Sequence, residues 1–256
     1  MKLLALALML CIGAAAQTID EAHALLARVK SVGLSTLTRN DTEPWLRKAA
    51  KIWAAKDPLN PEHAQVLVLL GMIVHSKHPT DAEAMRKDVE PLYRQAVDIY
   101  NQNAATADPS DVALALEAEA DVLIKIGSSA ESKPLKERAT DIRKKHIEDL
   151  QKDAPTGPSE GLQRIGGGVA APAVVSKVEP SYSEVARFIK QQGTVVFGLV
   201  VGTDGVPSKL RLLRSLGFDL DEEGLRAIRT WRFRPATRDG QPVPVFATIE
   251  VSFRLL

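Results

Sequence analysis

The sequence predicts two kinds of fold in one chain: a domain of repeated helix pairs, followed by a small α+β domain. Three helix-like segments of similar sequence begin at Pro44, Pro91 and Pro134, which indicates a repeat of helical units. From Val174 onward, short helical patterns alternate with segments of period two, which is typical of an α+β domain. The final segment, Val243 to Leu255, holds this alternation over its whole length, so we expect a long strand with one buried face.

Residues 1–16 have the features of a signal peptide. Lys2 gives a short positive region, Leu3–Ile12 is apolar, and Ala14–Ala16 offers a cleavage site of small residues. The apolar run is shorter than the roughly 20 residues that a membrane-spanning helix needs. Export to the periplasm is therefore favoured over anchoring in the inner membrane.

The composition is that of a soluble globular protein with balanced charge. The chain has 256 residues, 33 Lys and Arg against 32 Asp and Glu, and a formal net charge of +1, so no basic footprint for nucleic acid is expected. The one cysteine, Cys11, follows bulky Leu10 and is interpreted as part of the apolar signal region, not as a lipid-attachment site. The mature chain would then contain no disulfide.

Residues 17–150 are predicted to form a helical repeat domain. The three proline positions are spaced by 47 and then 43 residues, and each proline suits the first turn of a helix. Between them, Asn60-Pro61 and Asp108-Pro109 predict helix starts with an Asn or Asp cap. The segment 18–32 is expected to be a leading or capping helix. The pattern resembles degenerate tetratricopeptide repeats, and an unrelated helical bundle is the alternative.

No metal or nucleotide site is expected. His75 and His78 have a spacing that can bind metal on a helix, but Lys77 and Pro79 beside them indicate a helix end in water, and no third ligand matches. The glycines at 166–168 lack the Gly-Lys-Ser/Thr ending of a phosphate loop. Residues 151–171 are interpreted as a linker.

Residues 172–256 are predicted to form the α+β domain. Its expected elements are a helix over 184–191, a strand over 194–201, a turn at 203–205, a strand over 208–215, a helix from 219 to 231 and the final strand. Asp219 and Glu222 are expected to form a capping box. Trp231 lies on the apolar face of its helix and is a candidate core anchor.

The final strand carries the candidate binding site. Its alternation places Val245, Ala247, Ile249, Val251 and Phe253 on one face and Phe246, Thr248, Glu250 and Ser252 on the other. Pro242 and Pro244 at its start are tolerated mainly on an edge strand, because proline lacks an N–H. A long edge strand offers unpaired backbone groups to a partner.

The blocks Gln192-Gly-Thr-Val195 and Trp231-Arg-Phe-Arg-Pro-Ala236 resemble the C-terminal domain of TonB energy transducers, and the resemblance continues over about 85 residues. It implies a three-stranded antiparallel sheet with two helices on one face. It also implies that the last strand receives a short receptor peptide, the TonB box. The implied core residues are Tyr182, Gly193, Trp231, Phe233 and Pro235. Ser183 departs from the family, which commonly has proline there.

The function expected from these features is that of a periplasmic TonB-like protein in transport across the outer membrane. Its partners would be the TonB box of outer-membrane receptors and an unidentified protein bound by the helical repeats. The alternative is a soluble periplasmic scaffold without energy coupling. The edge strand could instead pair with itself in a homodimer or be covered by the segment from Val169 to Val175. No catalytic motif is found, so neither an enzymatic activity nor a cofactor is expected.

Overall fold

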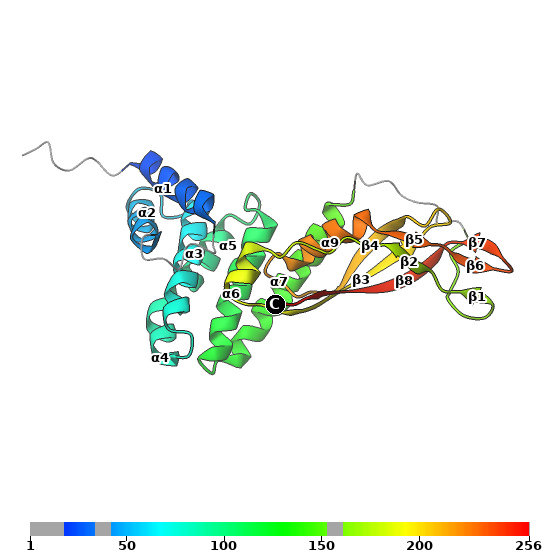
Figure 1. Cartoon of the computed structure of the whole chain (residues 1–256). Coiled ribbons are helices and arrows are strands. Elements are labelled where there is room, and N and C mark those ends of the chain that lie inside the picture. Colours follow the sequence, from blue (N-terminus) through cyan, green and yellow to red (C-terminus); the bar gives the residue numbers. More distant parts are fainter. Residues whose placement is uncertain (1–17, 34–41, 153–160, 256) are drawn as a thin grey trace, which may run out of the picture. The chain divides into compact units, whose positions relative to one another are not determined.

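The computed structural model describes residues 18–33, 42–152 and 161–255 (Figure 1). The predicted signal peptide with Cys11 lies outside these residues. Helices followed by antiparallel sheets confirm the predicted fold class. Among the described residues, no helix has both the length and the apolar character to cross a membrane.

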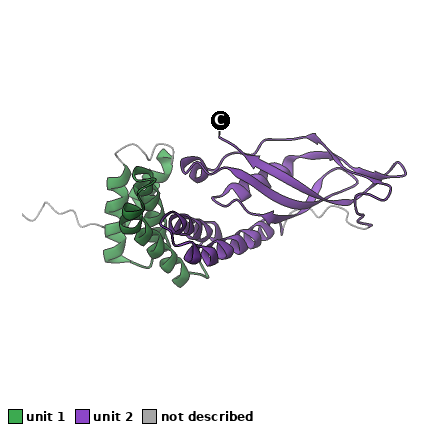
Figure 2. Ribbon diagram, turned by 90° about the horizontal axis from the view of Figure 1, so that it is seen from below, with its two compact units in different colours: residues 1–106 green, residues 107–256 purple. Residues whose placement is uncertain are grey.

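The contacts divide the chain into two compact units, residues 1–106 and 107–256 (Figure 2). This division differs from the predicted linker at 151–171, because two helices before the linker pack on the C-terminal domain. Residues 153–160 of that linker lie outside the described part. The rest of it is not free, since Gln163 and Val169–Ala170 pair with strands of the domain. The predicted domain bounds themselves stay a prediction, which cleavage of the chain can test.

Unit 1 is a stack of helices in chain order, with contacts between α1 and α2, α2 and α3, and α3 and α5. Asn60 caps α3 through a hydrogen bond from the Glu62 N–H to its side chain, as the sequence predicts. Gly71 of α3 faces the ring of Tyr93 so closely that a Cβ would have no room. The elements are α1 (Ile19–Val32), α2 (Thr42–Lys56), α3 (Pro61–Lys77), α4 (Ala82–Ala84), the π-helical segment η2 (Met85–Val89) and α5 (Glu90–Gln102).

Unit 2 begins with the hairpin of α6 (Pro109–Lys125) and α7 (Ser129–Asp149). Asp108 caps α6 by accepting the Ser110 N–H, as predicted. Pro134, which was expected in a first turn, is inside α7, because that helix begins five residues earlier at Ser129. The helices predicted at the three prolines are therefore present, but Pro134 does not mark the start of its helix.

The rest of unit 2 is built on the antiparallel sheet β4-β3-β8. Helix α9 covers the inner face of this sheet, where Gly224 lies against the ring of Phe197. Two small sheets, β1-β6-β7 and β2-β5, were not expected from the sequence. The elements are β1 (Val169–Ala170), β2 (Ala173–Ser176), α8 (Glu184–Phe188), β3 (Gly193–Val201), β4 (Pro207–Arg214), α9 (Leu220–Thr230), β5 (Arg232–Arg234), β6 (Ala236–Arg238), β7 (Gln241–Val243) and β8 (Val245–Phe253).

The predicted final strand is divided at Pro244. Its first part, β7, pairs with β6, and its second part, β8, pairs with β3 over its whole length, from Val245 opposite Val201 to Phe253 opposite Gly193. The chain leaves β3 at a tight turn where the Gly205 N–H bonds to the Gly202 carbonyl. The carbonyl of Phe233 fills the space that a side chain at Gly205 would need, so glycine is required there.

Candidate functional site

Strand β8 lies at one edge of the main sheet, with β3 on its inner side (Figure 1). The predicted alternation is present: Val245, Ala247, Val251 and Phe253 are buried and Ile249 is half-buried, whereas Phe246, Thr248, Glu250 and Ser252 are exposed. The buried side chains fix the strand to the core. Within the described part of the chain, β3 is the one strand that pairs with β8, and no strand pairs with its outer edge.

The direction of the backbone groups follows from two hydrogen bonds. The Thr194 carbonyl accepts from Arg214 Nε at 3.3 Å, so Thr194 of β3 faces β4. Because Ser252 is opposite Thr194 in an antiparallel ladder, its N–H and C=O point away from β3. At the other end, the Pro244 carbonyl points outward and accepts the Gln163 N–H at 2.9 Å. Every second residue between them shares this direction.

Four residues therefore direct both backbone groups away from β3: Phe246, which adjoins the bridge between Gln163 and Val245, and Thr248, Glu250 and Ser252. Within the described ranges, the pairing of this edge is limited to the single bridge between Gln163 and Val245. From Thr248 to Ser252 the edge can accept an added strand.

The opposite edge of the sheet, along β4, is covered. Helix α7 packs beside β4, and Ile147 of α7 is fully buried. The Gln151 side chain donates from Nε2 to the Leu210 carbonyl at 2.8 Å and so satisfies a backbone group of that edge. The two edges of the sheet therefore differ, and β8 is the one available for pairing.

The outer face beside β8 has an apolar centre. The ring of Phe246 reaches across to Gly198 of β3, in the space where a Cβ of that glycine would lie, and Leu213 of β4 closes on it from the other side. Phe246 keeps 44% of its surface exposed and Leu213 keeps 48%. An added strand would place alternate side chains next to Phe246, Thr248 and Glu250.

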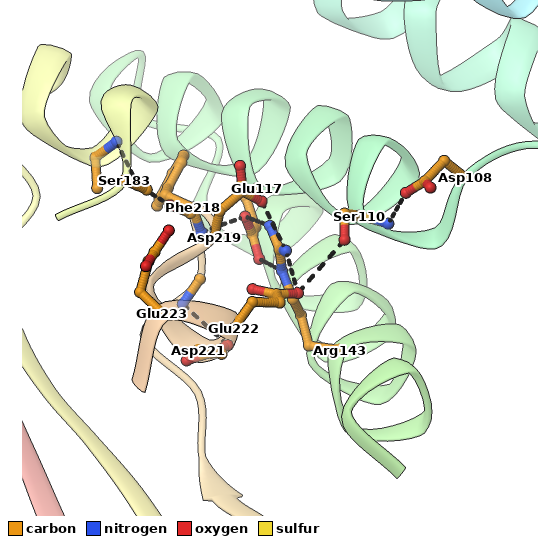
Figure 3. Close-up of polar contacts among 12 residues, drawn as sticks. Asp108, Ser110, Glu117, Arg143, Ser183, Phe218, Asp219, Asp221, Glu222 and Glu223 are labelled. Atoms are coloured by element: carbon orange, nitrogen blue, oxygen red, sulfur yellow. Dashed lines mark hydrogen bonds and ion pairs between the residues drawn. The ribbon is translucent and has the colours of Figure 1, made fainter. Parts of the chain in front are cut away.

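The hairpin of helices α6 and α7 is joined to the C-terminal domain by a buried ion cluster around Arg143 (Figure 3). Its guanidinium binds Glu117 of α6 at two points, Nε to Oε1 at 3.0 Å and Nη2 to Oε2 at 2.9 Å. Its Nη1 reaches Asp219 and Glu222 at the start of α9, each at 2.8 Å. The expected capping box of Asp219 and Glu222 is therefore wrong, since both carboxylates bind Arg143 and Asp219 has a left-handed backbone without a side-chain cap.

The charges of this cluster are not balanced. One buried guanidinium faces three carboxylates, of which those of Glu117 and Glu222 are buried and that of Asp219 is partly exposed. Burial alone lowers the pKa of Arg143, but the three carboxylates outweigh it and hold that pKa well above its usual value. Burial raises the pKa of Asp219 against the attraction of Arg143. The excess negative charge makes the junction sensitive to loss of its single cation.

The loop before α9 is held from both sides. Glu117 also accepts the Phe218 N–H at 2.7 Å, while Ser183 donates to the Phe218 carbonyl at 2.6 Å. Ser183 in addition accepts the Ala186 N–H and so caps α8, which explains how this chain starts that helix with serine. The loop is thus a shared element of the hairpin, α8 and α9.

Asp221 lies in the first turn of α9 and is fully buried. It accepts hydrogen bonds from the Ser215 hydroxyl and from the Leu216 N–H, the latter at 2.9 Å. Burial nevertheless raises the pKa of Asp221 to about 6. The structure therefore stabilises the protonated carboxyl of Asp221 relative to the unfolded chain.

The candidate core residues lie at different depths. Trp231 and Phe233 are buried, and Trp231 Nε1 donates to the Val178 carbonyl at 2.8 Å. Tyr182 is half-buried with its ring edge-on to Phe253 at 5.6 Å. Gly193 and Pro235 are also half-buried.

His75 and His78 lie at the end of α3, and no group of three His, Cys, Asp or Glu side chains in the described ranges could hold a metal ion.

Comparison with known proteins identifies the type of this domain. Residues 178–255 match the family described as "Gram-negative bacterial TonB protein C-terminal". The chain carries a TonB C-terminal domain. It is also similar to Protein TonB of Vibrio cholerae serotype O1, with 36% identity over 107 residues, which are 41% of this chain and 44% of the relative. The match therefore spans less than half the length of this curated relative.

Sequence reasoning missed two residues that shape the site. Arg143 was seen only as one position of a helical repeat, although three carboxylates at Asp219, Asp221 and Glu222 exceed what a helix start needs and could have suggested a buried cation. Gln163 was assigned to the linker, and no sequence signal marks its contact with Pro244.

Proposed function

We propose that the C-terminal domain binds the TonB box of an outer-membrane receptor as an added strand along β8, and that the protein acts in TonB-dependent transport across the outer membrane. The proposal rests on the outer edge of β8, where Phe246, Thr248, Glu250 and Ser252 direct their N–H and C=O groups away from the sheet. The match to the TonB C-terminal family supports this assignment. Strand addition to a sheet edge is an established way to bind peptides.

The energetics favour a weak, reversible complex. Each main-chain hydrogen bond contributes about 0.5–1.5 kcal/mol net, because the peptide gives up bonds to water. Three fully open residues, Thr248, Glu250 and Ser252, offer one donor and one acceptor each. Contacts of the peptide side chains with Phe246 and with the aliphatic carbons of the neighbouring exposed side chains would add selectivity for particular peptides. A complex of this kind suits a partner that must be released again.

We propose that the helical repeats bind a second protein. The cluster at Arg143 supports a direct connection between such a partner and the edge strand, because it fixes α6 and α7 to α9 of the C-terminal domain. The same arrangement supports the second candidate function, a periplasmic scaffold that brings two proteins together without energy coupling. Under both functions the protein acts by binding and not by catalysis.

Periplasmic location is part of the proposal and depends on cleavage after Ala16. Fractionation of cells, followed by sequencing of the N-terminus of the mature protein, tests it. A mature chain that begins at Gln17 in the periplasmic fraction supports the scaffold function. A chain that keeps residues 1–16 and stays with the inner membrane supports a force-transmitting transducer.

The binding proposal is tested with three forms of the full chain and a TonB-box peptide from an outer-membrane receptor. Thr248→Pro removes the outward N–H at the centre of the edge, whereas Thr248→Ala removes the side chain and keeps that N–H. We expect calorimetric titration to give weak binding for the unchanged chain and for Thr248→Ala, and strongly reduced binding for Thr248→Pro. Equal affinity of Thr248→Pro and Thr248→Ala would exclude strand addition at this position.

A further inference from the structure

One segment of the chain already occupies the beginning of the β8 edge. Gln163 forms a parallel bridge with Val245, and its N–H donates to the Pro244 carbonyl at 2.9 Å. The side chain is held as well, since Arg238 Nη1 donates to Gln163 Oε1 at 3.2 Å. Gln163 thus lies where the first residue of an added strand would lie.

The segment does not continue along the edge. The three glycines at 166–168 all have positive φ, between 57° and 103°, and the Gly166 and Val169 backbones bond to each other across this turn. The turn directs Val169–Ala170 to β6, where Val169 pairs with Arg238. Residues with a side chain rarely adopt such a run of positive φ, so the glycines redirect the chain away from β8.

Pro244 makes this end of the edge distinct. Proline has no N–H, so the edge offers only a carbonyl at this position, and Gln163 takes it. Beyond it, no residue that the structure describes pairs with the outward backbone groups of Thr248, Glu250 and Ser252. The edge is therefore closed at one end by the chain itself and open at the other.

We propose that Gln163 sets the register of the partner strand. It closes the edge at Pro244 and so confines the partner to the positions from Phe246 to Ser252, which corresponds to a strand of about seven residues. Gln163 acts as a positioning residue, because it determines which partner residue lies beside Phe246 and which beside Glu250. This inference rests on the proposed strand addition at β8.

Three receptor-derived TonB-box peptides test it: a core of about seven residues and two longer forms, extended by about four residues at the N-terminus or at the C-terminus. They are titrated into the ¹⁵N-labelled full chain, unchanged and as Gln163→Pro, which removes the N–H that binds Pro244. Arg164→Ala is the matched control in the same segment. Arg238→Ala loosens the Gln163 side chain without altering any backbone N–H.

In the unchanged chain and in Arg164→Ala, we expect shift changes on β8 to end at Phe246 and the extension that meets Gln163 to add no affinity. In Gln163→Pro, that same extension should improve binding about threefold to tenfold, because one or two backbone hydrogen bonds become available at Pro244. Arg238→Ala should give a smaller gain for the same peptide.

The outcomes separate the two proposals. Shift changes that pass Phe246 to Val243 in the unchanged chain, or equal affinity of each extended peptide for the unchanged chain and Gln163→Pro, overturn the register role while leaving strand addition intact. Binding of the core peptide without any change along β8 overturns strand addition itself, and the register role with it.

Discussion

Arg143 and Glu117 form a two-point ion pair that is closed to solvent, with Arg143 0% exposed. Through its third nitrogen the same guanidinium also holds Asp219 and Glu222 of the C-terminal domain. Arg143, a side chain of α7, thus supplies the positive charge that binds the two carboxylates at the start of α9. This relationship joins the α6–α7 hairpin to the domain that carries β8, the proposed binding edge.

Removal of the Arg143 guanidinium should destabilise unit 2 strongly. Arg143→Leu leaves Glu117, Asp219 and Glu222 without their counter-charge, and loss of one partner of a buried ion pair costs about 3–5 kcal/mol. Urea denaturation of the full chain measures this loss. Arg138→Leu, an exposed position on the same helix, is the control and should change the unfolding midpoint little. Equal midpoints for both variants would show that the cluster contributes no net stability.

Cleavage between the hairpin and the domain should not separate them. A specific protease site inserted within 153–160 allows the backbone to be cut while the contacts of Arg143, Gln151 and Ile147 remain. We expect the two fragments to elute together in native size-exclusion chromatography and to separate after Arg143→Leu. Separation of the unmutated fragments would instead support the domain boundary that the sequence predicts.

Asp221 should make the protein less stable as the pH rises through its folded pKa. Its pKa is 3.8 in the unfolded chain and about 6 in the fold, so the folded state favours the protonated form. The stability that this group contributes is fully present below pH 3.8 and is lost as the pH rises through about 6. Asp219, whose pKa burial also raises, acts in the same direction.

The difference in unfolding free energy between the unchanged chain and Asp221→Asn isolates this contribution, because other groups titrate equally in both. We expect the unchanged chain to lose stability relative to Asp221→Asn between pH 4 and pH 7. Urea titrations at several pH values measure it. A difference that stays constant over this range would mean that Asp221 does not titrate there.

Trp231 is expected to support the fold and not to contact a partner. It is 2% exposed and bonded to the Val178 carbonyl, so Trp231→Ala should cost about 3–5 kcal/mol and unfold the domain. Phe246→Ala is the matched control, because that ring is partly exposed on the outer face. Thermal melting compares the two. A Trp231→Ala protein that keeps its melting temperature would contradict the structural role.

Most helices, strands and caps could be predicted from the sequence because each depends mainly on residues close to it in the chain. The period-two alternation of β8 and the caps at Asn60 and Asp108 depend on neighbouring residues, and the structure has them. The roles of Arg143 and Gln163 depend on residues far away in the chain, such as Asp219 and Pro244. The capping box was wrong for this reason: a distant guanidinium binds the carboxylates more strongly than the helix start does.

Amide hydrogen exchange on β8 tests the central claim most directly. In the full chain without peptide, the N–H groups of Ile249 and Val251 bond to β3 and should exchange slowly, while those of Thr248, Glu250 and Ser252 should exchange fast. On addition of the receptor TonB-box peptide, we predict that Thr248, Glu250 and Ser252 become protected and that Ile249 and Val251 change little. Unchanged exchange of these three amides at a peptide concentration that saturates binding would contradict strand addition at β8.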